Sequence, residues 1–368
     1  MTRLLYLVSH PIQYQAPLLR RIAVEPGIKL RVVFGSLQSA QVHREPDFGL
    51  DVAWDVPLLE GYDHALLGST DLWQEIAAVD AVWIHGWQYA WQRRAMAMAA
   101  RQDVPVLMRG ENWSAAMPDP PGPLGWVKRL WRRRLFQRVQ GFLTIGRCNY
   151  DYYVAHGVPV TRLFSMPYAV DNSFFAARAE AASGQRDALR HQLGIGATQP
   201  VLLFAGKLTA RKCPDLLAAA WKQARWQGET PALLFVGDGA MRETVRQAAP
   251  AAFFAGFRNQ SELPALYDLA DLLVVPSRRE PWGLVVNEAM ACGTAVIASD
   301  EVGAAYDLIG PETGAVFRAG DVEGLAAMLA DCLARAEILG LAARERIAGW
   351  DFNAGVRGLK AALHAVVK

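Results

Sequence analysis

The stretch that decides the fold is RREPWGLVVNEAMACGT, residues 278–294. It follows an apolar run ending at Val275, and it predicts a glycine-containing turn and then a helix that Gly293 terminates. A strand, a glycine turn and a helix N-terminus in this order form an anion site at the carboxyl edge of a sheet, because unpaired N–H groups and the helix dipole face the ligand. We therefore expect backbone N–H groups near Gly283 and Leu284 to face phosphate or sugar hydroxyls.

Two carboxylates of this stretch, Glu280 and Glu288, are eight residues apart. The spacing places the first on the loop and the second about two turns into the helix. They can therefore contact two different parts of one long ligand. The alternative interpretation is that both are surface glutamates near the start of a helix, where negative charge is favourable.

Outward from this stretch, short apolar runs alternate with helical patterns. The predicted strands are 4–8, 30–34, 81–85, 105–109, 141–145, 201–205, 233–236, 252–254, 272–275 and 295–298. Such runs are typical of buried parallel strands joined by crossover helices. The two series are separated by a polar, alanine-rich, strand-free stretch at about 171–200, which we interpret as the domain junction and a helix after it. This order predicts doubly wound α/β domains at 1–170 and 171–350. After Gly320 the pattern is that of an amphipathic terminal helix.

Composition excludes several classes of protein. Lys plus Arg number 38 and Asp plus Glu 36, so the net charge of +2 does not indicate a nucleic-acid partner. The cysteines have no CxxC spacing, which argues against a disulfide framework or a zinc site and favours reduced thiols: Cys148, Cys213, Cys292 and Cys332. The apolar run at 4–8 is too short for a signal peptide or a membrane span, so we expect a cytoplasmic protein.

A second candidate phosphate element is FAGKLTARK, residues 204–212, which also follows a predicted strand. Gly206 lets a diphosphate approach the backbone, and Lys207 and Lys212 supply compact cations for its charged groups. On its own this pattern is weak, because a strand followed by basic loop residues is usually a solvated sheet edge. Neither a GxxxxGK[ST] loop nor a GxGxxG after the first strand occurs, which disfavours nucleotide hydrolysis and hydride transfer.

Together these motifs, in order, resemble the retaining GT-B glycosyltransferases of family 4 (glycosyl transferases group 1). The matching elements are 204–212, GDG at 237–239, GF at 256–257, LPALY at 263–267, PS at 276–277 and the Glu-x7-Glu element at 280–293. The resemblance implies two Rossmann-like domains facing across a cleft, with a UDP- or GDP-sugar held mainly by the second. It also implies that a C-terminal helix at about 351–368 packs back on the first domain.

By this resemblance the donor-binding residues are Gly206, Lys207, Lys212, Arg258, Glu280, Trp282, Gly283, Leu284 and Glu288. Lys207 and Lys212 would bind the diphosphate, Glu280 the sugar hydroxyls and Glu288 the ribose. Arg258 lies where such enzymes hold the base. Lys207 stands where arginine is common in the family, so the charge is kept and the bidentate geometry is lost.

The same resemblance implies transfer with retention at the anomeric carbon, and the leaving phosphate itself accepts the acceptor proton. Negative charge builds on the leaving diphosphate, and Lys207, Lys212 and helix amides would stabilise it without a metal ion. No Asp-x-Asp motif occurs in either segment, and no cofactor is expected, since the nucleotide-sugar is a substrate. The candidate catalytic residues are Glu280, Lys207, Lys212, Glu111 and His10. The alternative is a non-catalytic GT-B-like binding or scaffold protein.

In the first half, the strand tips carry polar residues that we assign to an acceptor site, since ligands of α/β sheets bind at this edge: Gln13, Tyr14, His85 and Arg109. His10 lies at the first strand tip, where a structural role is an equal alternative to a chemical one. Glu111 aligns with a sugar-contacting histidine of relatives. Alternatively, Arg109 pairs Glu111 structurally.

Residues 124–139 predict an amphipathic basic helix, with six basic and no acidic residues from Trp126 to Arg138. Leu124, Val127, Trp131, Leu135 and Val139 share a helical spacing. One interpretation is that this helix docks on the inner face of a membrane beside a glycan or lipid-linked acceptor. The other is that the apolar stripe packs into the first domain and leaves a solvated basic face.

Overall fold

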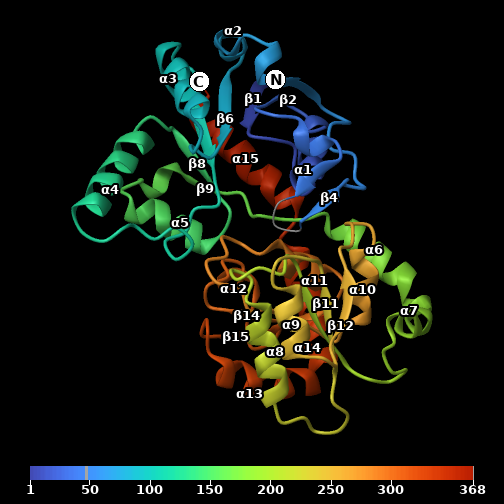
Figure 1. Ribbon diagram of the computed structural model, residues 1–368. Helices are drawn as coiled ribbons and strands as arrows, with labels where there is room; N and C mark the ends of the chain where they lie inside the picture. The colour runs from blue at the N-terminus through green and yellow to red at the C-terminus, as the bar shows by residue number, and fades with distance from the viewer. Residues whose placement is uncertain (46–48, 368) are drawn as a thin grey trace. The chain divides into compact units, whose positions relative to one another are not determined.

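The computed structural model describes residues 1–45 and 49–367. The chain forms two compact units (Figure 1). Unit 1 contains residues 1–43, 56–169 and 351–368, and unit 2 contains residues 44–55 and 170–350. Each unit is built on one parallel sheet. Within the described residues, no helix is both long and apolar enough to cross a membrane.

Unit 1 has a seven-stranded sheet in the order β5-β2-β1-β6-β7-β8-β9. Its elements are β1 (Thr2–Val8), α1 (Gln15–Ala23), β2 (Ile28–Phe34), β5 (Asp63–Leu66), α2 (Leu72–Ala77), β6 (Ala81–His85), α3 (Ala90–Arg101), β7 (Val106–Arg109), α4 (Pro123–Phe136), β8 (Gly141–Thr144), α5 (Arg147–Ala155), β9 (Leu163–Ser165) and α15 (Phe352–Val366). Single turns of 3₁₀ helix lie at Gln38–Ala40, Leu67–Ser69 and Val160–Arg162.

Unit 2 has a six-stranded sheet in the order β12-β11-β10-β13-β14-β15. Its elements are α6 (Asn172–Ala182), α7 (Arg186–Leu193), β10 (Val201–Ala205), α8 (Pro214–Gln223), β11 (Ala232–Val236), α9 (Arg242–Ala248), β12 (Phe253–Gly256), α10 (Leu263–Leu269), β13 (Leu272–Val275), α11 (Leu284–Ala291), β14 (Ala295–Ser299), α12 (Ala305–Leu308), β15 (Gly314–Phe317), α13 (Val322–Ala334) and α14 (Ala336–Ala348). A 3₁₀ turn lies at Ser183–Gln185, and the short strands β3 (His43–Glu45) and β4 (Leu50–Val52) form a separate pair.

Both sheets have the doubly wound strand order, in which the chain reverses direction beside its first strand. In unit 1 this reversal lies between β1 and β6, which pair in parallel. In unit 2 it lies between β10 and β13, which also pair in parallel. The loops that leave the carboxyl ends of such strands diverge and form a crevice. This topology places residues 206–213 beside residues 276–283 in unit 2.

The last helix, α15, belongs to unit 1 because its apolar face is buried there. Val356, Leu359 and Leu363 share one core cluster with Leu4 of β1 and Leu18 of α1. In Figure 1 the red ribbon of α15 runs against the strands of unit 1, which begins at the other end of the chain. Asp351 is the N-cap of the helix, and its side chain accepts a hydrogen bond from the Ala354 N–H at 2.7 Å.

The structure differs from the sequence expectations in several elements. Strands β5, β9 and β15 were not predicted, because each is a short edge or near-edge strand of three or four residues without a long apolar run. The region 171–200 holds two helices, and the region after Gly320 holds three. The basic helix ends at Phe136, three residues before the predicted end.

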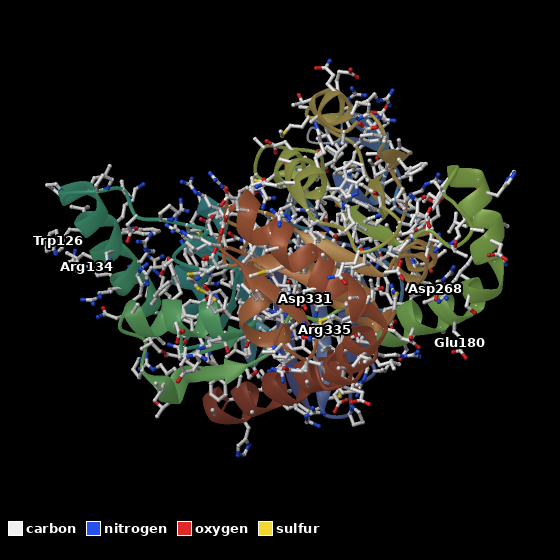
Figure 2. All side chains as sticks on the ribbon, turned by 90° about the horizontal axis from the view of Figure 1, so that it is seen from below. Trp126, Arg134, Glu180, Asp268, Asp331 and Arg335 are labelled. Carbon is white, nitrogen blue, oxygen red and sulfur yellow. The ribbon has the colours of Figure 1, made fainter. Side chains whose placement is uncertain are left out.

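The orientation of α4 shows which part of its apolar stripe packs into unit 1. Leu135 and Val139 are buried as expected. The expectation that the rest of the stripe packs into the domain was wrong, since its side chains are 57%, 53% and 43% exposed: Leu124, Val127 and Trp131. Figure 2 shows Trp126 and Arg134 projecting from α4 away from the sheet of unit 1.

Candidate active site

The candidate site of unit 2 begins with the loop after β10, which lies against the loop after β11. The Gly206 N–H donates to the Val236 carbonyl oxygen at 2.9 Å, and the Leu208 N–H donates to the Asp238 carbonyl oxygen at 2.8 Å. A Cβ atom at Gly237 would lie 2.0 Å from the Gly206 carbonyl oxygen, so only glycine permits this approach. Gly206 itself has a φ of +147° and no atom within 4 Å of its Cβ position, which leaves its backbone open.

Two cations of this loop converge on Glu280. Lys212 Nζ lies 2.6 Å and Arg211 Nη1 lies 2.7 Å from the same carboxylate oxygen, Oε2. Glu280 is only 8% exposed. Burial alone would raise its pKa, but the attraction of Lys212 and Arg211 outweighs burial and lowers the pKa below its usual range. The loops after β10 and β13 therefore present an ionised carboxylate held between two positive groups.

The backbone around Glu280 is fixed by the segment that follows β14. The Glu280 N–H donates to the Glu301 carbonyl oxygen at 2.9 Å, and the Gly303 N–H donates to the Glu280 carbonyl oxygen at 3.1 Å. Gly283 then adopts a φ of +94° and begins α11 as its N-cap, without a side-chain cap. The first N–H groups of α11 therefore keep hydrogen-bonding capacity next to the Glu280 carboxylate.

Glu288 lies in α11, 2% exposed, and accepts a hydrogen bond from the Tyr267 hydroxyl at 2.5 Å. Burial raises its pKa to about 7, and the Tyr267 hydrogen bond only partly offsets this rise. One neutral hydrogen-bond donor only poorly offsets the free-energy cost of burying an ionised carboxylate. Glu280 and Glu288 therefore differ in charge state near neutral pH, although both come from one motif.

The other predicted donor residues have defined partners. Lys207 Nζ lies 2.7 Å from Oε1 of Glu45, within unit 2. Arg258 Nη1 lies 3.0 Å from Oε1 of Glu262. Trp282 is 3% exposed, and Leu284 is 8% exposed. The Trp282 indole donates to Asn287 Oδ1 and stacks on the Trp350 ring at 5.6 Å between centroids, so its side chain lies in the packing beneath the loop.

In unit 1 the polar side chains gather where β1, β6 and β7 end. His85 Nδ1 lies 3.0 Å from the Tyr6 hydroxyl and 3.3 Å from Gln15 Nε2. Burial, together with the positive charges of Arg109 and His10, lowers the pKa of His85 to about 3. His85 is therefore a neutral hydrogen-bonding group at neutral pH.

Arg109 and Glu111 are connected through Tyr168. Arg109 is 1% exposed, its Nη2 donates to the carbonyl oxygens of Met166 and Pro167, and its guanidinium lies 5.0 Å from the centre of the Tyr168 ring. The Tyr168 hydroxyl donates to Glu111 Oε1 at 2.5 Å. Burial lowers the pKa of Arg109 and raises that of Tyr168. Arg109 thus orders the turn at 166–168 that holds Glu111.

The three remaining predictions lie on the segment between β1 and α1. His10 is exposed, and its Nδ1 lies 2.9 Å from the Ser9 hydroxyl. Gln13 is 9% exposed, and Tyr14 is the N-terminal flanking residue of α1. All three lie at the same sheet edge as His85, since β1 pairs directly with β6.

Comparison with known proteins identifies the family. Residues 185–346, which include the β10 loop, Glu280 and Glu288, match the family model of glycosyl transferases group 1. This part of the chain belongs to the group 1 glycosyltransferases. A D-inositol 3-phosphate glycosyltransferase of Xylanimonas cellulosilytica is 28% identical over 353 residues, which are 90% of this chain and 80% of that protein. A GDP-mannose-dependent α-(1-6)-phosphatidylinositol monomannoside mannosyltransferase of Mycolicibacterium smegmatis is 29% identical over 60% of this chain and 62% of its own length.

Solved structures show the fold of the chain. HepE of Anabaena in complex with UDP superposes with a TM-score of 0.74 at 16% identity, covering 98% of this chain and 99% of that one. A glycosyltransferase of Rickettsia africae superposes with the same TM-score at 14% identity, over 99% of both chains. The chain therefore has the GT-B fold, with two parallel α/β sheets of seven and six strands.

Three site residues of the glycosyltransferase were missed in the sequence. Arg211 contacts Glu280 from within the very motif that was quoted for Lys207 and Lys212. Tyr267 and Tyr168 hold Glu288 and Glu111, respectively. The signal for Arg211 was its place next to Lys212. The two tyrosines lie on a helix and on a turn far from their partners in sequence, so only the tertiary structure brings them together.

Proposed function

We propose that this group 1 glycosyltransferase moves a sugar from a UDP- or GDP-sugar to a glycan or lipid-linked acceptor, with retention of configuration and without a metal ion. The observation that carries the proposal is the convergence of Lys212 and Arg211 on Glu280 beside the open start of α11. A diphosphate needs positive charge, and a sugar ring needs a carboxylate acceptor for its hydroxyls. The loops after β10 and β13 offer both, with Lys212 and Arg211 within hydrogen-bond distance of Glu280.

The proposed donor assignments are those that the resemblance to the family implies. Lys207 and Lys212 bind the two phosphates, Glu280 accepts hydrogen bonds from the sugar hydroxyls, and Glu288 faces the ribose. The relatives support a nucleotide-sugar donor, since one is named as GDP-mannose-dependent and HepE was solved with UDP. Lys207 and Lys212 currently contact Glu45 and Glu280, so the donor diphosphate replaces carboxylates as their partner.

The chemical step needs few protein groups. The bond from the anomeric carbon to the diphosphate breaks while the acceptor oxygen bonds to the same face, and the acceptor proton passes to the departing phosphate oxygen. Lys207, Lys212 and the α11 amides stabilise the negative charge that builds on the leaving group. Glu111, whose carboxylate accepts a hydrogen bond from the Tyr168 hydroxyl, is a candidate catalytic group of unit 1. His10 is a second candidate catalytic group in unit 1.

The acceptor assignment rests on the edge of the unit 1 sheet. Gln13, Tyr14, neutral His85 and the Arg109 turn supply hydrogen-bond donors and acceptors suited to hydroxyls rather than to a strongly charged group. Several relatives are named for phosphatidylinositol-linked acceptors. We therefore propose a cytoplasmic enzyme that works at the inner face of a membrane, which it contacts through residues 124–139.

The test begins with a thermal-shift screen of the protein against UDP, GDP and their sugar derivatives, because a ligand that binds only the folded state raises the melting temperature. NMR of the early transfer product should then show the donor's anomeric configuration retained. EDTA should leave turnover unchanged. An inverted product would reject the retaining mechanism and point to His10 as a general base, and binding without transfer to any acceptor would favour a non-catalytic scaffold protein.

A further inference from the structure

Residues 53–55 come from the first half of the chain but belong to unit 2, where they contact the loop after β12. Asn259 Nδ2 donates to the Ala53 carbonyl oxygen at 2.8 Å, and the Ser261 N–H donates to Asp55 Oδ2 at 3.1 Å. The Ser261 hydroxyl donates to the same carboxylate oxygen. These contacts fix the orientation of the Asn259 amide, because its nitrogen must face the Ala53 carbonyl group.

The loop after β12 lies at the same sheet edge as the candidate diphosphate loop after β10. Strand β11 pairs in parallel with both β10 and β12, so all three strands end at this edge. The Gly237 N–H, after β11, donates to the Gly256 carbonyl oxygen of β12 at 2.8 Å. Two strand spacings put the ends of β10 and β12 about 10 Å apart. The ribose and diphosphate of a nucleotide can cover this span.

The loop after β12 keeps buried hydrogen-bonding atoms that no protein group pairs. Within residues 1–45 and 49–367, no hydrogen-bond partner reaches Arg258 Nε, Asn259 Oδ1 or Gln260 Oε1. Gln260 is only 5% exposed. Buried polar atoms of folded proteins nearly always have a partner, and an exception calls for an explanation. Three such atoms on consecutive residues indicate that a polar ligand binds at this loop.

The chemistry of these three atoms selects among the nucleobases. The Arg258 Nε–H is a donor, and the amide oxygens of Asn259 and Gln260 are acceptors. Among the common bases, only guanine has one acceptor and two donors along its Watson–Crick edge, namely O6, N1–H and N2–H. Uracil has one donor between two acceptors, so it would leave one amide oxygen unpaired. An unpaired buried acceptor costs binding free energy.

We infer that the loop after β12 binds a guanine base, so that the donor is a GDP-sugar rather than a UDP-sugar. The inference rests on the proposed function, which places a nucleotide at this sheet edge. Residues 258–260 contact the base after side-chain rotations of the kind that commonly accompany binding. Asp55 is a positioning residue, because it holds the loop through Ser261 and keeps the Ala53 carbonyl group at Asn259.

Calorimetry with GDP, IDP and UDP tests the inference, because IDP lacks only the 2-amino group of guanine. The wild type should bind GDP at least about tenfold more tightly than IDP or UDP. The Asn259→Ala/Gln260→Ala variant should bind GDP and IDP about equally, since the acceptors of the amino group are gone. Asp55→Ala should reduce the preference for GDP over UDP and leave the affinity for inorganic pyrophosphate unchanged, which a general loss of structure would not do.

The matched control is Gln223→Ala/Gln247→Ala, which removes two exposed amides from α8 and α9 of the same unit. It should keep the full preference for GDP. A wild type that binds UDP as tightly as GDP, or an Asn259→Ala/Gln260→Ala variant that still prefers GDP over IDP, would overturn guanine recognition. Tight UDP binding with transfer from a UDP-sugar would reject the guanine assignment alone, whereas no binding of any nucleotide would reject the proposed function as well.

Discussion

Folding buries the carboxyl group of Glu288, where its ionisation costs free energy. It is fully buried in α11 and has the Tyr267 hydroxyl as a neutral donor. A glutamine at this position would keep the hydrogen bond and the volume without the ionisation. We interpret the carboxylate as a group kept for the donor ribose at the expense of stability, as is common in functional sites.

The first prediction concerns the pH dependence of unfolding. Between about pH 4.5 and about pH 7 the folded state keeps the Glu288 proton that the unfolded state has lost, so stability falls as pH rises through this window. The Glu288→Gln variant should lack this fall. The free energy of unfolding of the variant minus that of the wild type should be on the order of 3 kcal/mol larger at pH 8 than at pH 4. Urea unfolding of both proteins at each pH measures this, and parallel pH profiles would contradict the buried titration.

Glu280 should separate nucleotide binding from sugar transfer. In the Glu280→Ala variant, Lys212 and Arg211 lose their carboxylate partner and become free for the diphosphate, so affinity for the free nucleotide should be kept or increased. Transfer should fall by two or more orders of magnitude, because the group that we propose to contact the reacting sugar is lost. Calorimetry and a transfer assay check both, with Glu243→Ala on exposed α9 as the control. Undiminished transfer would remove Glu280 from the site.

At the scale of elements, two glycines of α15 test how the helix packs on unit 1. A Cβ atom at Gly358 would lie 1.8 Å from the Ser165 carbonyl oxygen of β9, whereas one at Gly355 would make only ordinary contacts of 3.7 and 3.9 Å. Gly358→Ala should therefore destabilise the protein by about 1–3 kcal/mol. Gly355→Ala should stabilise it by up to about 1 kcal/mol through helix propensity. Equal effects in urea unfolding would show that α15 does not approach β9 this closely.

The elements also show what can be predicted from a sequence. The interior strands of both sheets follow from their apolar runs, and the β10 and β13 loops follow from their glycines and charges. The orientation of α4 could not be predicted, because its apolar residues also fit a buried stripe and only Gly125 and Arg132 mark the inner face. The contacts of Tyr168 with Glu111 and of Tyr267 with Glu288 join residues 57 and 21 positions apart, and no local pattern records them.

At the scale of the whole molecule, the doubly wound order of each sheet brings polar and charged side chains together at one edge. In unit 2 the reversal between β10 and β13 brings Lys212 to Glu280, and in unit 1 the reversal between β1 and β6 brings His85 to Tyr6. The cation, carboxylate and helix start of the proposed donor site all belong to unit 2. Substitutions in the unit 2 loops should therefore change the affinity for the donor even when no acceptor is present.

The most direct measurement is the affinity for the best nucleotide of the screen, by calorimetry, in the wild type and in Lys212→Ala. The loss of a charge-assisted contact costs about 1.5–3 kcal/mol, so the dissociation constant should rise between about tenfold and about a hundredfold. Lys222→Ala is the control, because Lys222 donates to the Ala248 carbonyl at the far end of α8 and should leave affinity unchanged. A folded Lys212→Ala protein that binds the nucleotide as tightly as the wild type would contradict the donor site proposed at the β10 and β13 loops of unit 2.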